Sequence, residues 1–260
     1  IIDNSDPFAA LAFRFFFVAV GFLLFSLYSK YSIIIKRKNL IESVLSGVLF
    51  HGLYLGGVFY SISIGMPTSI AALIVTLQPI LTNILSGPIL NEKVTLKQWI
   101  GVLLGFLGAT LVLGLDLGSK IPLLGLVATL IALISITAST IWQKKLSNNL
   151  PLSVSNFYQA VGGCFFHILV VIFFAKPYIA FTKTFLLSMG HQILLVSFGA
   201  FTILMFLIKK NSASKTVSIF FLIPATSALM AWFFLGETLT VIDLLGFLIT
   251  SIGVYIATRD

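Results

Sequence analysis

Two short stretches of this chain are copies of one pattern, and they decide its fold. The chain reads LNEKVT at residues 90–95 and LGETLT at residues 235–240, an offset of 237 − 92 = 145 positions. The same offset relates further residues of the two halves: Pro79 to Pro224, Gly101 to Gly246 and Gly108 to Gly253. One offset shared by so many positions indicates an internal duplication. We therefore predict two homologous repeats, at residues 1–117 and 118–260.

Each copy of the pattern places a Glu in a short polar break between two apolar runs. In the first copy Thr95 is followed three residues later by Gln98, which is the capping-box spacing for the start of a helix, and the second copy has the same spacing. We therefore interpret Glu92 and Glu237 first as turn and helix-cap residues. A role in gating is the alternative interpretation.

The composition indicates a membrane protein that crosses the bilayer several times. Hydrophobic residues make up 58% of the chain and charged residues 9%, and the mean hydropathy is +1.10, which no ordinary soluble domain reaches. Continuous apolar runs long enough to cross a bilayer as helices occur nine times, at residues 7–28, 43–62, 67–89, 96–115, 122–142, 152–175, 186–208, 213–235 and 240–257. The predicted fold class is an all-α polytopic membrane protein.

The basic residues predict the orientation of the chain in the membrane. The formal net charge is +8, but the charges are not grouped as a nucleic-acid partner would require. Twelve basic residues fall in alternate connections or at the C-terminus, and only three fall in the opposite set, Lys120, Lys176 and Lys183. This asymmetry is typical of a cytoplasmic (inner) membrane protein with a cytoplasmic C-terminus. The single Cys164 lies in an apolar run and forms no intrachain disulfide.

The repeat also predicts how the halves are related. The counterpart of the span at 122–142 would lie before residue 1, so we expect ten spans in a five-plus-five arrangement, with the first helix missing from this sequence. Five spans separate Glu92 from Glu237, and an odd number of crossings inverts the second half relative to the first. Inverted repeats are typical of secondary transporters that work by alternating access.

Polar residues inside the spans are the candidate substrate-cavity residues. Arg14 lies about two turns into the first span, where it either snorkels to the outer interface or faces a polar interior. His51 and Tyr54 share one helical face, and they either contact a neighbouring helix or line a cavity. The remaining candidates are Gln78, Asn83, Trp142, Tyr158 and Gln159.

Pro79 and Pro224 are predicted hinge or kink positions. Proline removes a backbone hydrogen bond, and interruptions at corresponding positions of two repeats indicate a binding site near the middle of the membrane. A role in packing alone is the alternative, because proline is common in membrane helices.

Several of these segments together resemble a known family. They are Phe13-Arg14-Phe15, Leu77-Gln78-Pro79, Leu90-Asn91-Glu92 and the Gly101 to Gly105 stretch, with Ile223-Pro224, Leu235-Gly236-Glu237 and Leu245-Gly246 as second copies. The chain is similar over essentially its whole length to the EamA-type permeases of the drug/metabolite transporter superfamily. The resemblance implies ten helices, a central cavity between the halves, and movement of small metabolites such as amino acids without ATP hydrolysis.

The predicted function is therefore secondary transport of a small polar or amphipathic metabolite, amino acid-like or other, by alternating access. A membrane-embedded enzyme and a non-transporting assembly subunit are the alternatives, but no catalytic motif, metal-ligand spacing or cofactor motif is present. The expected partners are the substrate, the lipid bilayer and a possible second copy of the chain bound through the Gly-rich helices. No carboxylate lies at mid-membrane, which favours facilitated diffusion or exchange, or a coupling carboxylate on the missing helix.

Overall fold

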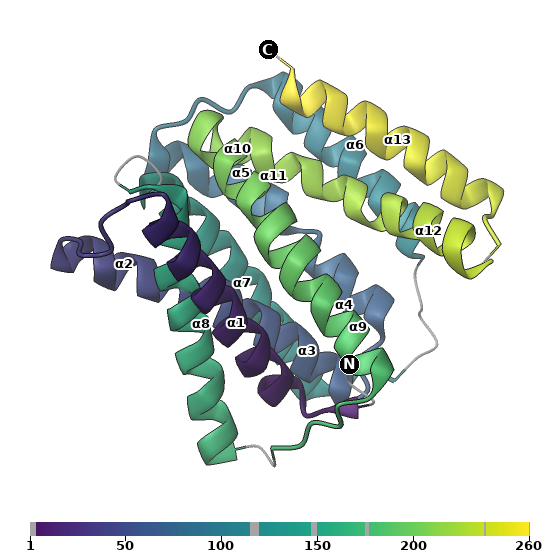
Figure 1. Ribbon diagram of the computed structural model, residues 1–260. Helices are drawn as coiled ribbons and strands as arrows, with labels where there is room; N and C mark the ends of the chain where they lie inside the picture. The colour runs from purple at the N-terminus through teal and green to yellow at the C-terminus, as the bar shows by residue number, and fades with distance from the viewer. Residues whose placement is uncertain (1–3, 115–119, 147–149, 175–176, 237, 260) are drawn as a thin grey trace.

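The computed structural model describes residues 4–114, 120–146, 150–174, 177–236 and 238–259, and this part of the chain is almost entirely helical (Figure 1). Within it, nine helices are long and apolar enough to cross a membrane. They are Pro7–Tyr28, Arg37–Ser63, Thr68–Leu90, Leu96–Leu113, Leu123–Leu146, Leu152–Phe174, Lys183–Lys210, Ala213–Phe234 and Val241–Thr258. The predicted fold class is confirmed. The second and seventh spans begin earlier than predicted, because these helices continue into polar residues at the interface.

Several spans are divided into shorter elements. The first half contains α1 (Pro7–Tyr28), α2 (Arg37–Gly47), η2 (Val48–Tyr54), α3 (Leu55–Ser63), α4 (Thr68–Val75), α5 (Gln78–Leu90) and α6 (Leu96–Leu113). The second half contains α7 (Leu123–Leu146), α8 (Leu152–Phe174), α9 (Lys183–His191), η3 (Gln192–Ala200), α10 (Phe201–Lys210), α11 (Ala213–Ser218), η4 (Ile219–Phe221), α12 (Leu222–Leu235) and α13 (Val241–Thr258).

The two copies of the sequence pattern form the same turn. The helices α5 and α12 each end at a residue in the left-handed conformation, Asn91 at φ 56° and Gly236 at φ 70°. These are residue types that adopt positive φ at low cost. A complete capping box then begins each following helix, at Thr95 for α6 and at Thr240 for α13. The capping prediction is confirmed. Glu237 lies outside the described residues.

The last helices of the two halves, α6 and α13, pack against each other in antiparallel directions (Figure 1). A Cβ added to Gly101 would lie 2.6 Å from the Gly253 carbonyl oxygen, and one added to Gly108 would lie 2.6 Å from that of Gly246. Glycine is required here because the two backbones touch. The repeat offset relates Gly101 to Gly246 and Gly108 to Gly253. The contact of Gly101 with Gly253 and the contact of Gly108 with Gly246 are therefore equivalent, each with one glycine from either half. This is the geometry that an inverted pair of halves would produce, and the five-plus-five arrangement stays a prediction.

The helix α12 packs on α13 and α6, and most of the other helices form a second group, in which α1 lies on α8 and α7 lies against η2, α3 and α5 (Figure 1). The core between α1 and α8 is apolar and includes Phe15, Val18 and Cys164. Many large apolar side chains remain exposed on the outside, as a protein surrounded by lipid tails requires.

Candidate functional site

Two spans are interrupted at equivalent positions next to the repeated prolines. In the third span α4 ends at Val75, two turn residues follow, and α5 begins at Gln78 with Pro79 in its first turn. In the eighth span the 3-10 segment Ile219–Phe221 separates α11 from α12, and Pro224 lies in the first turn of α12. Both prolines therefore begin a new helix after a break, where the missing N–H is tolerated. Both spans are thus interrupted beside the repeated prolines, and the role of these prolines as hinges or kinks stays a prediction.

A second pair of interruptions was not predicted. The second span contains the π-helical segment η2 at Val48–Tyr54, and the seventh span contains the π-helical segment η3 at Gln192–Ala200. Shifted by the repeat offset of 145, η3 corresponds to residues 47–55, so the two segments coincide. π-helical segments are rare and are frequent at functional sites. Each half thus carries two local departures from α-helix, and they lie at matching positions of the repeat.

Arg14 connects α1 to one of these π-helical segments. Its side chain is 5% exposed, and its Nε donates a 3.0 Å hydrogen bond to Oγ of Ser197, in the middle of η3. Ser197 in turn donates to the carbonyl oxygen of Gln192 at 3.1 Å. Among the described residues no carboxylate forms an ion pair with Arg14 and no acceptor bonds its terminal nitrogens. A buried cation without a counter-charge is costly in a membrane protein.

The other π-helical segment, η2, carries His51 and Tyr54, and it packs near Arg14 through Phe15. Tyr54 lies three residues after His51 in this segment, and the rings of both contact that of Phe50. The His51 ring lies 4.4 Å from the ring of Phe15 and 4.7 Å from that of Phe201, measured between centroids. Its Nδ1 is buried with no hydrogen-bond partner among the described residues. Three of the predicted cavity residues, Arg14, His51 and Tyr54, are therefore close together, on α1 and η2.

Two other predicted cavity residues each form a buried hydrogen bond with a side chain of α7. Gln78 donates from Nε2 to Oγ1 of Thr140 at 3.0 Å. Gln159 accepts from Gln143 at 2.9 Å and donates to Ser155 at 3.1 Å. Their polar groups therefore stabilise helix packing in this conformation, and their role in a substrate cavity stays a prediction.

The remaining predicted cavity residues are dispersed. Asn83 is buried on α5, and neither its amide oxygen nor its amide nitrogen has a partner among the described residues. Tyr158 donates its hydroxyl to the carbonyl oxygen of Ile33 at 2.7 Å, which ties α8 to the connection after α1. Trp142 is half-buried near the end of α7. Of these three, Asn83 has unsatisfied polar atoms that a ligand could bond.

Glu92 joins the two halves. Its carboxylate accepts hydrogen bonds from the backbone N–H of Ala213 at 2.7 Å and of Ser214 at 3.2 Å, and from the Ser214 hydroxyl at 3.0 Å. A carboxylate at a helix N-terminus satisfies otherwise unpaired N–H groups and interacts favourably with the helix dipole. Glu92 therefore caps the eighth span, as the cap interpretation expects, but it caps a helix of the other half.

Ser197 is the site residue that sequence reasoning missed. It is a small hydroxyl residue in an apolar run, and such residues usually bond their own helix. The repeat offset would have drawn attention to it, because its counterpart is Gly52, the neighbour of His51. Among the described residues, no group of three or more His, Cys, Asp or Glu is placed to hold a metal ion.

Comparison with known proteins assigns the chain to a family. A model of the EamA-like transporter family matches residues 1–114 and 123–259. The uncharacterized transporter YyaM of Bacillus subtilis (strain 168) is 26% identical over 99% of this chain and 86% of its own length, and the uncharacterized transporter YvbV of the same strain is 27% identical over 82% and 69%.

Two further matches extend the comparison. A protein of Salmonella typhimurium named as a probable amino-acid metabolite efflux pump is 24% identical over 76% of this chain and 70% of its own length. A solved structure that is 15% identical shares the fold, with a TM-score of 0.79 over 97% of this chain and 88% of that one. The chain is thus a multi-pass integral membrane protein and belongs to the EamA-like transporter family.

Proposed function

We propose that the protein is a secondary transporter that moves a small metabolite bearing a carboxylate across the cytoplasmic membrane by alternating access. The observation that carries this proposal is Arg14, a buried cation on a membrane span with no acidic partner among the described residues. Such a charge is normally balanced. In this proposal the substrate carboxylate balances it and leaves with each transport cycle.

The surroundings of Arg14 suit this role. The hydrogen bond from Nε to Ser197 fixes the plane of the guanidinium and leaves its two terminal nitrogens for a ligand. A planar guanidinium binds a carboxylate through two parallel hydrogen bonds, which gives both strength and orientation. His51 packs on Phe15, the neighbour of Arg14, and His51 and Tyr54 add polar groups to an aromatic wall that includes Phe15 and Phe50.

Alternating access is supported by the arrangement of the halves. Matching interruptions in both repeats provide places where these spans can change their angle during a transport cycle. The name of the Salmonella relative favours an amino acid or a similar metabolite as substrate. The excess of basic residues in alternate connections favours a cytoplasmic C-terminus.

The test is transport by purified protein in liposomes, after a thermal-shift screen of amino acids, nucleosides and sugars has identified a ligand. The substrate is compared with its carboxamide analogue, which lacks the negative charge. The wild-type protein should prefer the carboxylate by at least about tenfold, and Arg14→Gln should lose this preference, while Arg14→Lys should keep part of it. Ser197→Ala should raise KM about fivefold, for the loss of one hydrogen bond of about 1 kcal/mol.

Ser63→Ala is the matched control for Ser197→Ala, because the Ser63 hydroxyl bonds only the carbonyl of its own helix on the exposed surface. Arg14→Gln protein that transports the carboxylate with wild-type KM would contradict the substrate class. Chemical turnover of the ligand without flux would favour a membrane-embedded enzyme, and neither turnover nor flux would favour an assembly subunit.

A further inference from the structure

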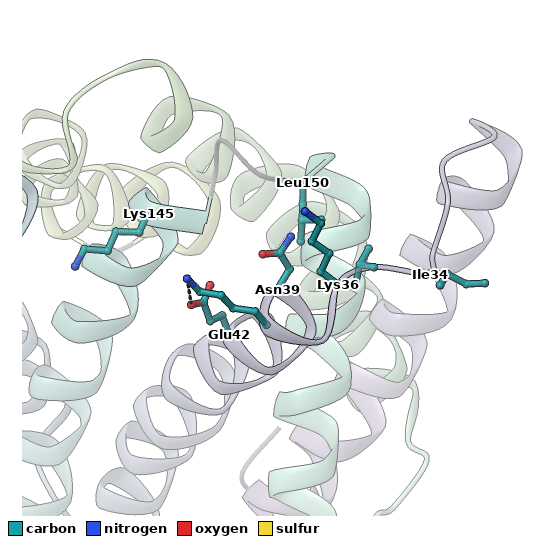
Figure 2. A pocket seen from close by; sticks show the side chains of 8 residues that line it. Ile34, Lys36, Asn39, Glu42, Lys145 and Leu150 are labelled. Atoms are coloured by element: carbon teal, nitrogen blue, oxygen red, sulfur yellow. Dashed lines mark ion pairs between the residues drawn. The ribbon is translucent and has the colours of Figure 1, made fainter.

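The end of the molecule that holds most of the basic residues contains a pocket away from Arg14. It has a volume of about 750 Å³ and lies between the connection after α1, the start of α2 and the ends of the helices α7 and α8 (Figure 2). Its lining residues are Ile34, Ile35, Lys36, Lys38, Asn39, Glu42, Lys145 and Leu150. This volume is within the range of about 300–1,000 Å³ that ligand pockets occupy.

The pocket is electropositive. Three lysines and one glutamate line it, and Glu42 is already paired with Lys38 at 4.0 Å. Among the described residues the side chains of Lys36 and Lys145 have no acidic partner. The helix α2 begins at Arg37, and the side chain of its N-cap residue, Lys36, accepts no hydrogen bond from its first N–H groups. These N–H groups therefore add positive partial charge at this end of the helix. Figure 2 shows Lys36 beside Asn39, whereas Lys145 lies at the far edge of the pocket with its ammonium directed away from these two residues.

The pocket also adjoins apolar surface at the level of the membrane interface. Ile34, on its rim, is 87% exposed, as is Tyr28 at the end of α1. Tyr31 is exposed as well, and tyrosines at this depth are typical of the headgroup region. A soluble anion would contact only the basic side chains of the pocket. A phospholipid would contact these through its anionic headgroup and the exposed apolar side chains at the rim through its acyl chains.

We propose that this pocket binds the headgroup of an anionic phospholipid of the cytoplasmic leaflet. Lys36 contacts the phosphate, Asn39 donates a hydrogen bond from its amide, Lys145 adds positive charge at the edge of the pocket, and Ile34 lies against the acyl chains. Basic pockets between membrane helices on the cytoplasmic side recognise anionic lipids in this manner. The site spans α2, α7 and the start of α8, so a bound lipid holds these helices together. The inference does not depend on the proposed transport function.

The experiment is native mass spectrometry of the purified protein in detergent, with phosphatidylglycerol and phosphatidylcholine added at equal concentrations. The wild-type protein should retain phosphatidylglycerol in preference to phosphatidylcholine. The double variant Lys36→Gln, Lys145→Gln should bind phosphatidylglycerol about fivefold more weakly for each lysine removed. The double variant Lys36→Arg, Lys145→Arg should bind it normally.

The matched control is Lys93→Gln, Lys209→Gln, which removes two exposed lysines from the same end of the molecule outside the pocket. It should retain phosphatidylglycerol as the wild type does. Equal losses in the two Gln double variants would mean that the lipid responds to overall charge, and the pocket would not be a site. Retention of phosphatidylcholine as strong as that of phosphatidylglycerol, or displacement of the lipid by millimolar inorganic phosphate, would also overturn the proposal.

Discussion

Gly108 lies where the backbones of α6 and α13 touch, and it tolerates no side chain. A Cβ at this position would lie 2.6 Å from the Gly246 carbonyl oxygen and nearer still to Thr250. We predict that Gly108→Ala lowers the free energy of unfolding by about 1–3 kcal/mol, the usual effect of overpacking. Thermal unfolding in detergent measures this effect.

Gly190→Ala is the control for that measurement, because a Cβ at Gly190 meets nothing within 4 Å. It should leave stability unchanged or raise it by up to about 1 kcal/mol, since alanine is the better helix former. Equal effects of the two substitutions would show that α6 and α13 separate easily.

The glycines of α6 and α13 contact each other within one chain, so they are not free to bind a second copy in this structure. The homo-oligomer stays a prediction.

Arg14 illustrates what the sequence can and cannot predict about a single residue. A charge within an apolar run is costly enough to identify it as a candidate. Its partner Ser197 is 183 positions away, and nothing in the local sequence distinguishes it from serines that bond their own helix. Gln78 and Gln159 are equally good candidates by sequence, because a polar side chain that bonds another helix has the same sequence signature as one that faces a cavity.

At the scale of elements, Glu92 holds the start of the eighth span. We predict that Glu92→Ala lowers the free energy of unfolding by about 1–2 kcal/mol, because the N–H groups of Ala213 and Ser214 lose their acceptor. The same variant should show faster hydrogen exchange in α11. Glu42→Ala is the control, since its ion pair with Lys38 is long, at 4.0 Å, the Lys38 side chain is 83% exposed, and such a pair contributes about 0–1 kcal/mol. Unchanged exchange in α11 would contradict a capping role.

The prolines after the helix breaks should affect transport more than folding. In Pro79→Ala and Pro224→Ala the restored N–H allows the flanking helices to join, so the span loses its bend. We expect flux in liposomes to fall while the melting temperature changes little. Pro88→Ala is the matched control, because Pro88 lies inside α5 and has no counterpart in the second half. Normal flux in both hinge variants would limit these prolines to a packing role.

The helix breaks also show why sequence reasoning found one pair of interruptions and missed the other. A proline cannot donate its backbone hydrogen bond, so its effect can be read from the sequence. The π-helical segments at Val48–Tyr54 and Gln192–Ala200 contain no residue type that dictates them. They depend on how η2 and η3 pack against other helices, which is a tertiary effect.

At the scale of the whole molecule, the predicted orientation can be tested with single cysteines. The native Cys164 is buried, so a membrane-impermeant maleimide should label an exposed introduced cysteine far more than Cys164. In intact cells Lys120→Cys should be labelled, whereas Lys93→Cys should be labelled only after the membrane is permeabilised. The reverse pattern would invert the orientation, and it would place the proposed lipid pocket in the outer leaflet.

The contact between α6 and α13 is not fully symmetric, because some residues around it differ between the two halves. Gly105 makes room for the Phe221 ring, which a Cβ there would approach to 2.6 Å, but the counterparts of these two residues are Thr250 and Thr76. Two identical halves would give a carrier whose resting shapes toward either compartment have equal energy. The difference between Phe221 and Thr76 makes the two halves unequal at this contact. In the alternating-access cycle that we propose, this inequality would give the two open shapes different energies, and the empty protein would favour one compartment over the other.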